Sequence, residues 1–266
     1  MDYCIKEPSC VAVYAENGAG NCWVFKVEQL QQLRQQFSSI GGKIAVKMEL
    51  PNGSCAETST GNTMTLSVTT ATNYYMLSIV PATDDIWNLT TVTKLSCPSG
   101  YRLWRRPKGW WCIGVHTAAD CIPQTTAASY CSAQGRILSG LETIEEMNFV
   151  YSIGQPMHEK ETVYAKYGYW VDGSRTPSCT PPNKRNGSIC NGINEFSFAD
   201  PLLSTYGGYV FGATQPDGIS GTSPNPSCLM VLLSKSEKFG IDDNLCEKRV
   251  DSNFCYKGYA CGVRPS

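Results

Sequence analysis

Apolar and polar residues near the N-terminus follow a pattern that predicts short strands around one helix. Within residues 27–37, the apolar side chains at positions 27, 30, 33 and 37 are spaced by three or four residues, and glutamine fills much of the rest. This spacing is typical of an amphipathic helix. Strands are expected over residues 10–14 and 22–25 before it, and over residues 44–48 after it.

The middle of the chain allows two interpretations. Residues 56–96 contain no cysteine and are rich in Thr, Ser and Asn, which is the composition of a solvated linker. However, residues 64–68 alternate between apolar and polar side chains, and residues 74–80 also fit a strand. The segment is therefore either a set of strands packed on the first module or a linker.

Beyond residue 97 the pattern changes again. Residues 97–101 and 110–115 predict a hairpin, and helices are expected over residues 125–135 and 142–152. In the second helix the apolar residues share one face, and Glu145 and Glu146 are expected on the opposite face. Short strands and long loops follow, so the fold class is α+β.

Composition narrows the range of protein classes. At 266 residues the chain suits two domains, and 42% apolar with 17% charged residues is typical of globular domains rather than of a disordered chain. With a net charge of −1, the chain has no overall positive charge to attract nucleic acid. The apolar runs are far shorter than the roughly 20 residues of a membrane span, so no membrane span is expected.

The 14 cysteines are the strongest compositional signal. None form a C-x-x-C pair and the chain has only two histidines, so disulfides, up to seven of them, are favoured over zinc sites. Disulfides indicate an oxidising, extracellular location, and glycosylation sequons at Asn52, Asn88 and Asn186 agree with it. The first residues lack a secretory leader, so we expect that the leader has been removed or that the chain is a fragment or has a misplaced start.

An ordered series of motifs spans residues 95–266. In order, it consists of Cys97-Pro-Ser-Gly-Tyr, Trp111-Cys112-Ile, Ala128-x-x-Cys131-x-x-x-Gly135, Glu145-Glu146, Tyr169-Trp170-Val171-Asp172-Gly173, Phe196-Ser-Phe198, Gln215-Pro216-Asp217, Cys228, Asp242-Asp243-x-x-Cys246 and Tyr259-x-Cys261-Gly262. This series resembles a C-type lectin-like domain of the divergent nematode type.

The resemblance implies a set of disulfides. The family pattern pairs Cys97–Cys112, Cys131–Cys261 and Cys228–Cys246. We expect two additional disulfides, Cys179–Cys190 and Cys121–Cys255. The second of these is expected because the first helix and the final strand of the family lie side by side.

Residues 1–94 are similar to the PAN/apple family, of the PAN-3 or CW type. The similarity rests on Cys10-Val-Ala-Val-Tyr, Cys22-Trp-Val-Phe, the glutamine-rich segment and Ala45-Val-Lys47. The expected protein is thus a disulfide-rich α+β chain of two domains, a PAN/apple-like module at 1–94 and a C-type lectin-like domain at 95–266.

The resemblance also implies a candidate calcium and sugar site. In this family a cis proline directs the flanking side-chain oxygens toward one calcium ion, and Gln215 and Asp217 hold those positions. Asp242 and Asp243 would supply further ligands from a neighbouring strand, because calcium takes six to eight oxygens. In the family that the chain resembles, a Gln-Pro-Asp triplet tends to favour galactose-type over mannose-type sugars.

Three departures count against that site. Ile241 and Asp242 replace the family's Trp and Asn, Pro226 stands where the family has a glutamate ligand, and residues 218–226 contain no acid. The alternative is a degenerate site, in which Gln-Pro-Asp-Gly is an ordinary turn.

Other candidates have simpler explanations. The hairpin carries four basic residues, Arg102, Arg105, Arg106 and Lys108. They either bind an anionic ligand or belong to a solvated turn. Trp110 and Trp111 would stack on a sugar or join the core. His116 and His158 have no motif around them. The sequence contains no motif of a catalytic site, so an enzyme is not expected.

Two functions remain open. The first is an extracellular recognition protein that binds carbohydrate, with calcium as a possible cofactor. The second is an extracellular module that binds other proteins without calcium and has a degenerate sugar site. The expected partners are therefore glycans or extracellular proteins.

Overall fold

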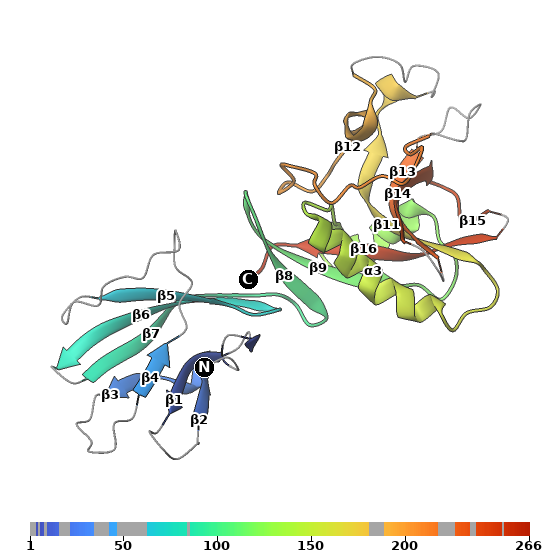
Figure 1. Cartoon of the computed structure of the whole chain (residues 1–266). Helices are drawn as coiled ribbons and strands as arrows, with labels where there is room; N and C mark the ends of the chain where they lie inside the picture. The colour runs from blue at the N-terminus through green and yellow to red at the C-terminus, as the bar shows by residue number, and fades with distance from the viewer. Residues whose placement is uncertain are drawn as a thin grey trace. The chain divides into compact units, whose positions relative to one another are not determined.

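The structure is a computed structural model of the chain, and it forms two compact units (Figure 1). The N-terminal unit comprises Met1–Pro98 and Pro265–Ser266, and the C-terminal unit comprises Ser99–Arg264. The structure describes residues 4, 6–7, 10–15, 22–34, 43–46, 63–83, 86–180, 189–217, 227–234, 238–251 and 253–266.

The N-terminal unit contains two antiparallel sheets. One has the strand order β2-β1-β4 and the other the order β3-β7-β6-β5. The strands are β1 (Cys10–Ala15), β2 (Cys22–Lys26), β3 (Gln32–Arg34), β4 (Lys43–Val46), β5 (Met64–Thr69), β6 (Asn73–Thr83) and β7 (Ile86–Ser96).

The Thr- and Ser-rich segment forms strands from Met64 onward. Apolar side chains of β5, β6 and β7, such as Leu66, Leu77 and Leu89, form one core cluster with Val11 of β1. The linker interpretation does not hold for residues 63–96, since their alternating apolar positions are buried in this cluster.

The helix predicted over residues 27–37 is wrong. Val27–Gln29 form a single 3₁₀ turn, Gln32–Arg34 form β3, and residues 35–37 lie outside the described part of the chain. Leu33 of β3 pairs with Trp87 of β7 and packs on the same cluster as Val27. The spacing therefore identified residues that face the core, but pairing with β7 gives them an extended conformation.

The C-terminal unit is built on one large sheet. Its main path has the order β14-β13-β11-β16-β9-β8, and β11 and β16 are parallel while the other neighbours on the path are antiparallel. The strands on the path are β8 (Tyr101–Arg106), β9 (Gly109–Thr117), β11 (Lys166–Arg175), β13 (Ser227–Ser234), β14 (Lys238–Leu245) and β16 (Phe254–Val263). Three short strands join it, β10 (Ile137–Leu138), β12 (Phe196–Ser197) and β15 (Val250–Asp251).

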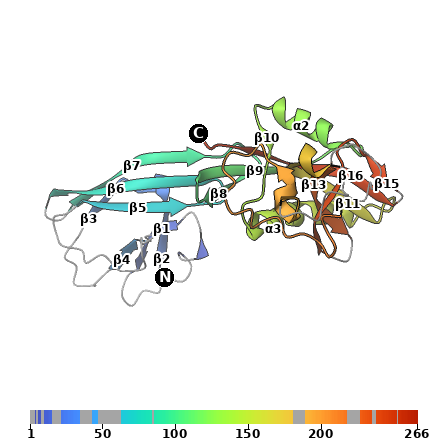
Figure 2. The ribbon, with the colours of Figure 1, turned by 90° about the horizontal axis from the view of Figure 1, so that it is seen from above.

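Two helices lie on opposite sides of this sheet, α2 (Gln124–Ser132) and α3 (Ile144–His158) (Figure 2). Both were expected at these places in the sequence. We call the side that packs on α3 the core face, because Tyr169, Val231 and Ile241 join Val150 of α3 in the main core cluster there. We call the other side the outer face.

The predicted polar face of the second helix needs one correction. Glu145 is exposed, but Glu146 is fully buried and its carboxylate accepts hydrogen bonds from Arg106 at 2.7 and 2.8 Å. Arg106, expected on a basic hairpin, is itself buried and also pairs with Asp200 at 2.8 Å. Each buried charge thus has a partner, as burial requires.

Among the described residues, twelve cysteines are bonded in disulfides. Four of the disulfides are pairs that the sequence analysis expected, and Cys97 and Cys112 are both disulfide-bonded; the four are Cys121–Cys255, Cys131–Cys261, Cys179–Cys190 and Cys228–Cys246. Cys4–Cys10 is a further disulfide. Seven disulfides are not reached, because Cys22 is free and exposed; Cys55 lies outside the described residues.

Candidate functional site

The Gln-Pro-Asp segment lies in a loop beside the edge strand β14. The peptide between Gln215 and Pro216 is cis, as the resemblance implies. The loop is attached to β14 by two backbone hydrogen bonds, from Gly212 to Ile241 at 3.0 Å and from Ile241 to Val210 at 2.8 Å. The segment and the two aspartates of β14 therefore meet at one edge of the sheet.

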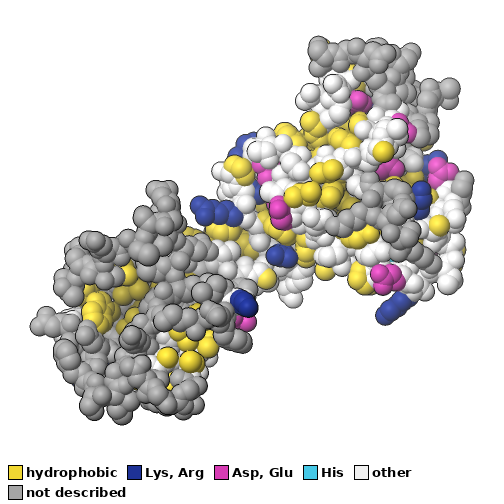
Figure 3. Space-filling model, in the orientation of Figure 1, with side chains coloured by type: hydrophobic (Ala, Val, Ile, Leu, Met, Phe, Trp, Pro, Cys, Tyr) yellow, Lys and Arg dark blue, Asp and Glu magenta, His cyan; other side chains and the backbone are white. Residues whose placement is uncertain are grey.

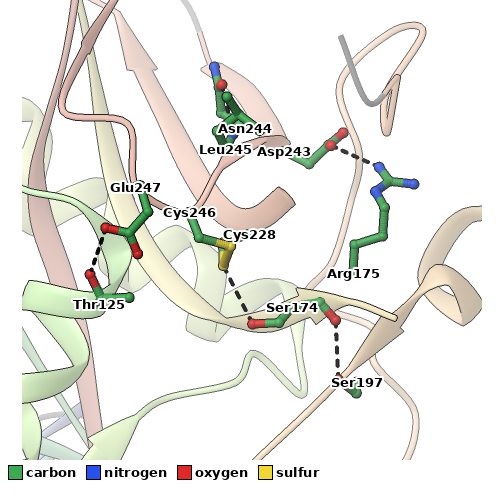
Figure 4. Close-up of a disulfide and its surroundings, with 10 residues drawn as sticks. All are labelled: Thr125, Ser174, Arg175, Ser197, Cys228, Asp243, Asn244, Leu245, Cys246 and Glu247. Atoms are coloured by element: carbon green, nitrogen blue, oxygen red, sulfur yellow. Dashed lines mark hydrogen bonds and ion pairs between the residues drawn. A yellow bond between two sulfur atoms is a disulfide. The ribbon is translucent and has the colours of Figure 1, made fainter. Parts of the chain in front are cut away.

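Asp243 points to the core face, where it is used by the protein itself. Its carboxylate accepts a hydrogen bond of 2.8 Å from Nη2 of Arg175, and both side chains are almost fully buried (Figure 4). The same guanidinium forms an ion pair with Glu195. Arg175 thus supplies the positive charge that the two buried carboxylates require.

Asp242 points to the outer face, since successive side chains of a strand alternate between faces. It is paired in register with Met230 of β13, and Met230 with Trp170 of β11. Burial, together with the negative charges of Asp243 and Asp217, raises the pKa of Asp242 to about 6. The two aspartates are adjacent in sequence, but their side chains point to opposite faces of the sheet.

These residues do not fit a calcium ion in the arrangement that the structure shows. The carboxylate of Asp243 bonds to Arg175, and the Gln215 side-chain oxygen accepts a hydrogen bond from the backbone N–H of Asp217 at 2.9 Å. Calcium requires six to eight oxygens directed at one point. Within the described residues no group of three or more His, Cys, Asp or Glu side chains could hold a metal ion; residues 218–226, including Pro226, lie outside them.

A cleft opens on the outer face next to Asp242. It has a volume of about 320 Å³ and combines polar, charged and aromatic side chains. Its walls are formed by Ala165, Lys166, Leu232, Asp242, Asn244, Asp251, Asn253, Phe254 and Tyr256. Apart from Asp242, the sequence analysis missed these residues, because they come from five strands and two loops. The alternating pair Asp242-x-Asn244 was the available signal.

The basic hairpin holds its cations against its own aromatic rings. Arg102 lies 4.7 Å from the ring centroid of Trp104, and Arg105 lies 5.9 Å from that of Trp110. Trp111 is buried in the core cluster, which leaves Trp110 as the partly exposed member of the pair. Lys108 donates to the backbone carbonyl of Leu203. On the face drawn in Figure 3, basic and acidic side chains of the described residues are scattered rather than gathered in one patch.

The remaining candidates are packed or exposed in ordinary ways. His158 is buried and stacks on Tyr167, with 3.7 Å between the ring centroids. Its Nε2 lies 3.1 Å from the Tyr169 hydroxyl, and burial lowers the pKa of His158 to about 4. His116 contacts the Tyr101 hydroxyl at 3.0 Å. Asn88 is exposed on β7.

Asn52 and Asn186 lie outside the described residues. In the part of the chain that is described, no helix is both long and apolar enough to cross a membrane.

Comparisons with known families agree with this architecture. A family described as C-type lectin domain-containing protein 141/158 matches residues 105–264, and a PAN-like domain matches residues 1–48. No curated protein sequence matches the chain significantly.

Three similar solved structures each cover about two thirds of the chain. A calcium-independent type II antifreeze protein is 18% identical, with 65% of this chain and 97% of that chain covered and a TM-score of 0.40. Human lithostathine is 18% identical over 64% and 91%, with a TM-score of 0.39. The carbohydrate-recognition domain of the mouse scavenger receptor C-type lectin is 14% identical over 64% and 100%, with a TM-score of 0.38.

Proposed function

Because the chain belongs to the C-type lectin domain-containing protein 141/158 family and carries a PAN-like domain before its lectin-like fold, we propose that it is an extracellular recognition protein. Its C-terminal unit binds carbohydrate, and this binding does not require calcium.

The observation that carries the calcium-independent part is the buried pair of Asp243 and Arg175. The resemblance assigns Asp243 to calcium, but here its carboxylate bonds at 2.8 Å to a guanidinium that is always protonated. A calcium ion at that carboxylate would lie beside a fixed positive charge in a buried environment, which is strongly unfavourable. Arg175 therefore neutralises Asp243 in place of a metal ion.

The extracellular part of the proposal rests on the cysteines. Twelve of them are bonded in disulfides, and disulfides persist in oxidising compartments but are rare in the cytosol. The disulfides Cys121–Cys255 and Cys131–Cys261 each join segments more than a hundred residues apart in sequence, at separations of 134 and 130. Closing loops of this length is a typical way to stabilise a secreted domain.

The test is glycan-array binding measured twice, once with calcium and once with excess EDTA. We expect the same glycans to bind with equal strength in both conditions, and we expect titration calorimetry with calcium chloride to show no binding heat. Loss of binding in EDTA would contradict calcium independence. If no glycan binds in either condition, carbohydrate recognition is refuted and the alternative, an adhesive module that binds proteins, takes its place.

A further inference from the structure

We propose that the cleft on the outer face is the sugar-binding site of the C-terminal unit, and that it holds one pyranose ring without a metal ion. This inference rests on the proposed carbohydrate binding and adds its location. It separates the site from the Gln-Pro-Asp loop, to which the sequence analysis assigned it.

The size of the cleft suits a small ligand. Its volume of about 320 Å³ lies at the lower end of the roughly 300–1,000 Å³ typical of small-molecule sites. The cleft is formed by side chains on neighbouring strands of the sheet, including Asp242 of β14, Leu232 of β13 and Tyr256 of β16. A site built on strands holds the side chains that contact the ligand in fixed positions.

The polar wall presents both donors and acceptors. The Asn244 amide is oriented by two hydrogen bonds, donating to the Tyr256 hydroxyl at 2.5 Å and accepting from the Leu245 backbone at 2.8 Å. Asn253 and Lys166 stand at the exposed rim. Sugar hydroxyls both donate and accept, so a wall of amides, carboxylates and one ammonium group can satisfy them in pairs.

The charges of the cleft favour a neutral ligand. Asp251 is already paired with Lys248 at 2.6 Å, and the positive charge of Lys166 acts on Asp242. An anionic ligand would meet the carboxylates of Asp242 and Asp251, and a simple cation would be opposed by Lys166. A neutral polyhydroxylated ring avoids both penalties.

The apolar wall supplies the surface on which a sugar ring packs. Phe254 is partly exposed and contacts Tyr256 edge to face, with 4.5 Å between the ring centroids. Leu232 and Ala165 extend the apolar surface. The C–H face of a pyranose is apolar and packs against aromatic rings, while its hydroxyls remain available to the polar wall.

The experiment compares two pairs of variants in the full chain. The wild-type protein is first screened on a glycan array, and the methyl glycoside of the bound sugar is then titrated by calorimetry. We expect Asn253→Ala and Lys166→Ala to weaken binding by about tenfold or more each, because each loses a hydrogen bond at the rim. Gln215→Ala and Asp217→Ala serve as matched controls in the neighbouring loop and are expected to bind like the wild type.

The outcomes separate this inference from the proposed function. Asn253 and Lys166 are both exposed, but the Asn253 amide oxygen also accepts a hydrogen bond from the Ala165 backbone at 3.2 Å. Circular dichroism therefore checks that each variant is folded, and Lys166→Met replaces Lys166→Ala if that variant is unstable. If both cleft variants bind the sugar as strongly as the wild type, the cleft is not the sugar-binding site. The proposed carbohydrate binding is not contradicted by that result. A wild-type protein that binds no glycan refutes the proposed function, and the cleft with it.

Discussion

Adjacent residues in this protein carry charges in very different environments. Asp243 is buried on the core face and is bound by Arg175, whereas Asp242 faces the cleft next to the exposed Lys166. The backbone N–H of Asp243 donates to the Asp242 carboxylate at 2.8 Å, which partly offsets the cost of burying that charge. The remaining cost appears as the raised pKa of Asp242.

The raised pKa of Asp242 predicts how its replacement changes stability with pH. The pKa is about 6 in the folded protein against an ordinary value of 3.8, so the folded state binds more protons between these values and stability falls as pH rises through that range. Asp242→Asn keeps the acceptor oxygen and removes the charge. We expect the variant to be more stable than the wild type by about 1–2 kcal/mol at pH 7.5, which allows for solvent screening, and nearly equal to it at pH 4.

Urea unfolding of both proteins at the two pH values measures this difference. Asp120→Asn is the control, because Asp120 is exposed and its replacement should have little effect at either pH. A variant less stable than the wild type at pH 7.5 would show that the charge of Asp242 is stabilising and that its burial has been overestimated.

The sequence indicated where the candidate site residues lie but not the contacts that these residues make. The order of motifs placed Gln215, Asp217, Asp242 and Asp243 at one edge of the sheet. It did not reveal that Arg175, 68 residues before Asp243, would bind its carboxylate. Local patterns carry no information on which distant side chain completes a buried pair, so the metal hypothesis could not be judged from sequence alone.

At the scale of elements, α3 is attached to the sheet by a buried charge network as well as by its apolar face. Glu146, on the first turn of the helix, bonds to Arg106 of β8, and Arg106 bonds to Asp200. Thr143 caps the helix by accepting a hydrogen bond from the Glu146 backbone at 3.3 Å. The first turn is therefore fixed both by its cap and by its side chain.

This network predicts a sharp contrast between two neighbouring glutamates. Glu146→Ala leaves the Arg106 guanidinium buried with one of its two carboxylate partners missing, and we expect a loss of about 3–5 kcal/mol in the free energy of unfolding. Glu145→Ala, one residue away and exposed, should change it by less than about 0.5 kcal/mol. Denaturant unfolding of the two variants under identical conditions checks the prediction, and equal losses in both would contradict the role given to Glu146.

The elements themselves were predicted with uneven success, for a physical reason. Both helices of the C-terminal unit were expected, and the second is marked by apolar residues that share one face. The segment 27–37 has the same periodicity, but Leu33 lies in a strand paired with β7. Periodicity reports which side chains face a core, whereas the conformation of a short segment is decided by the strands beside it.

At the scale of the whole molecule, the two units are stabilised in different ways. The C-terminal unit combines an extensive core, which includes Tyr169, Leu229 and Ile241, with four disulfides whose members all lie within it. In the N-terminal unit the described residues form two smaller clusters, around Leu77 and around Cys10. Cys4–Cys10 closes a short loop with a sequence separation of 6, and Cys22 is free.

The distribution of disulfides predicts how the protein reacts with a thiol reagent. The ten cysteines from Cys97 to Cys261 are all bonded, so none of them should react with iodoacetamide when the protein is denatured without a reductant. Cys22 is exposed and free, and it should be labelled even in the native protein. Peptide mapping by mass spectrometry identifies the modified positions, and labelling after reduction provides the positive control. Modification of any of these ten cysteines in the unreduced protein would contradict the disulfide framework of the structure. It would also weaken the assignment to an oxidising compartment, because that assignment depends on these disulfides being formed.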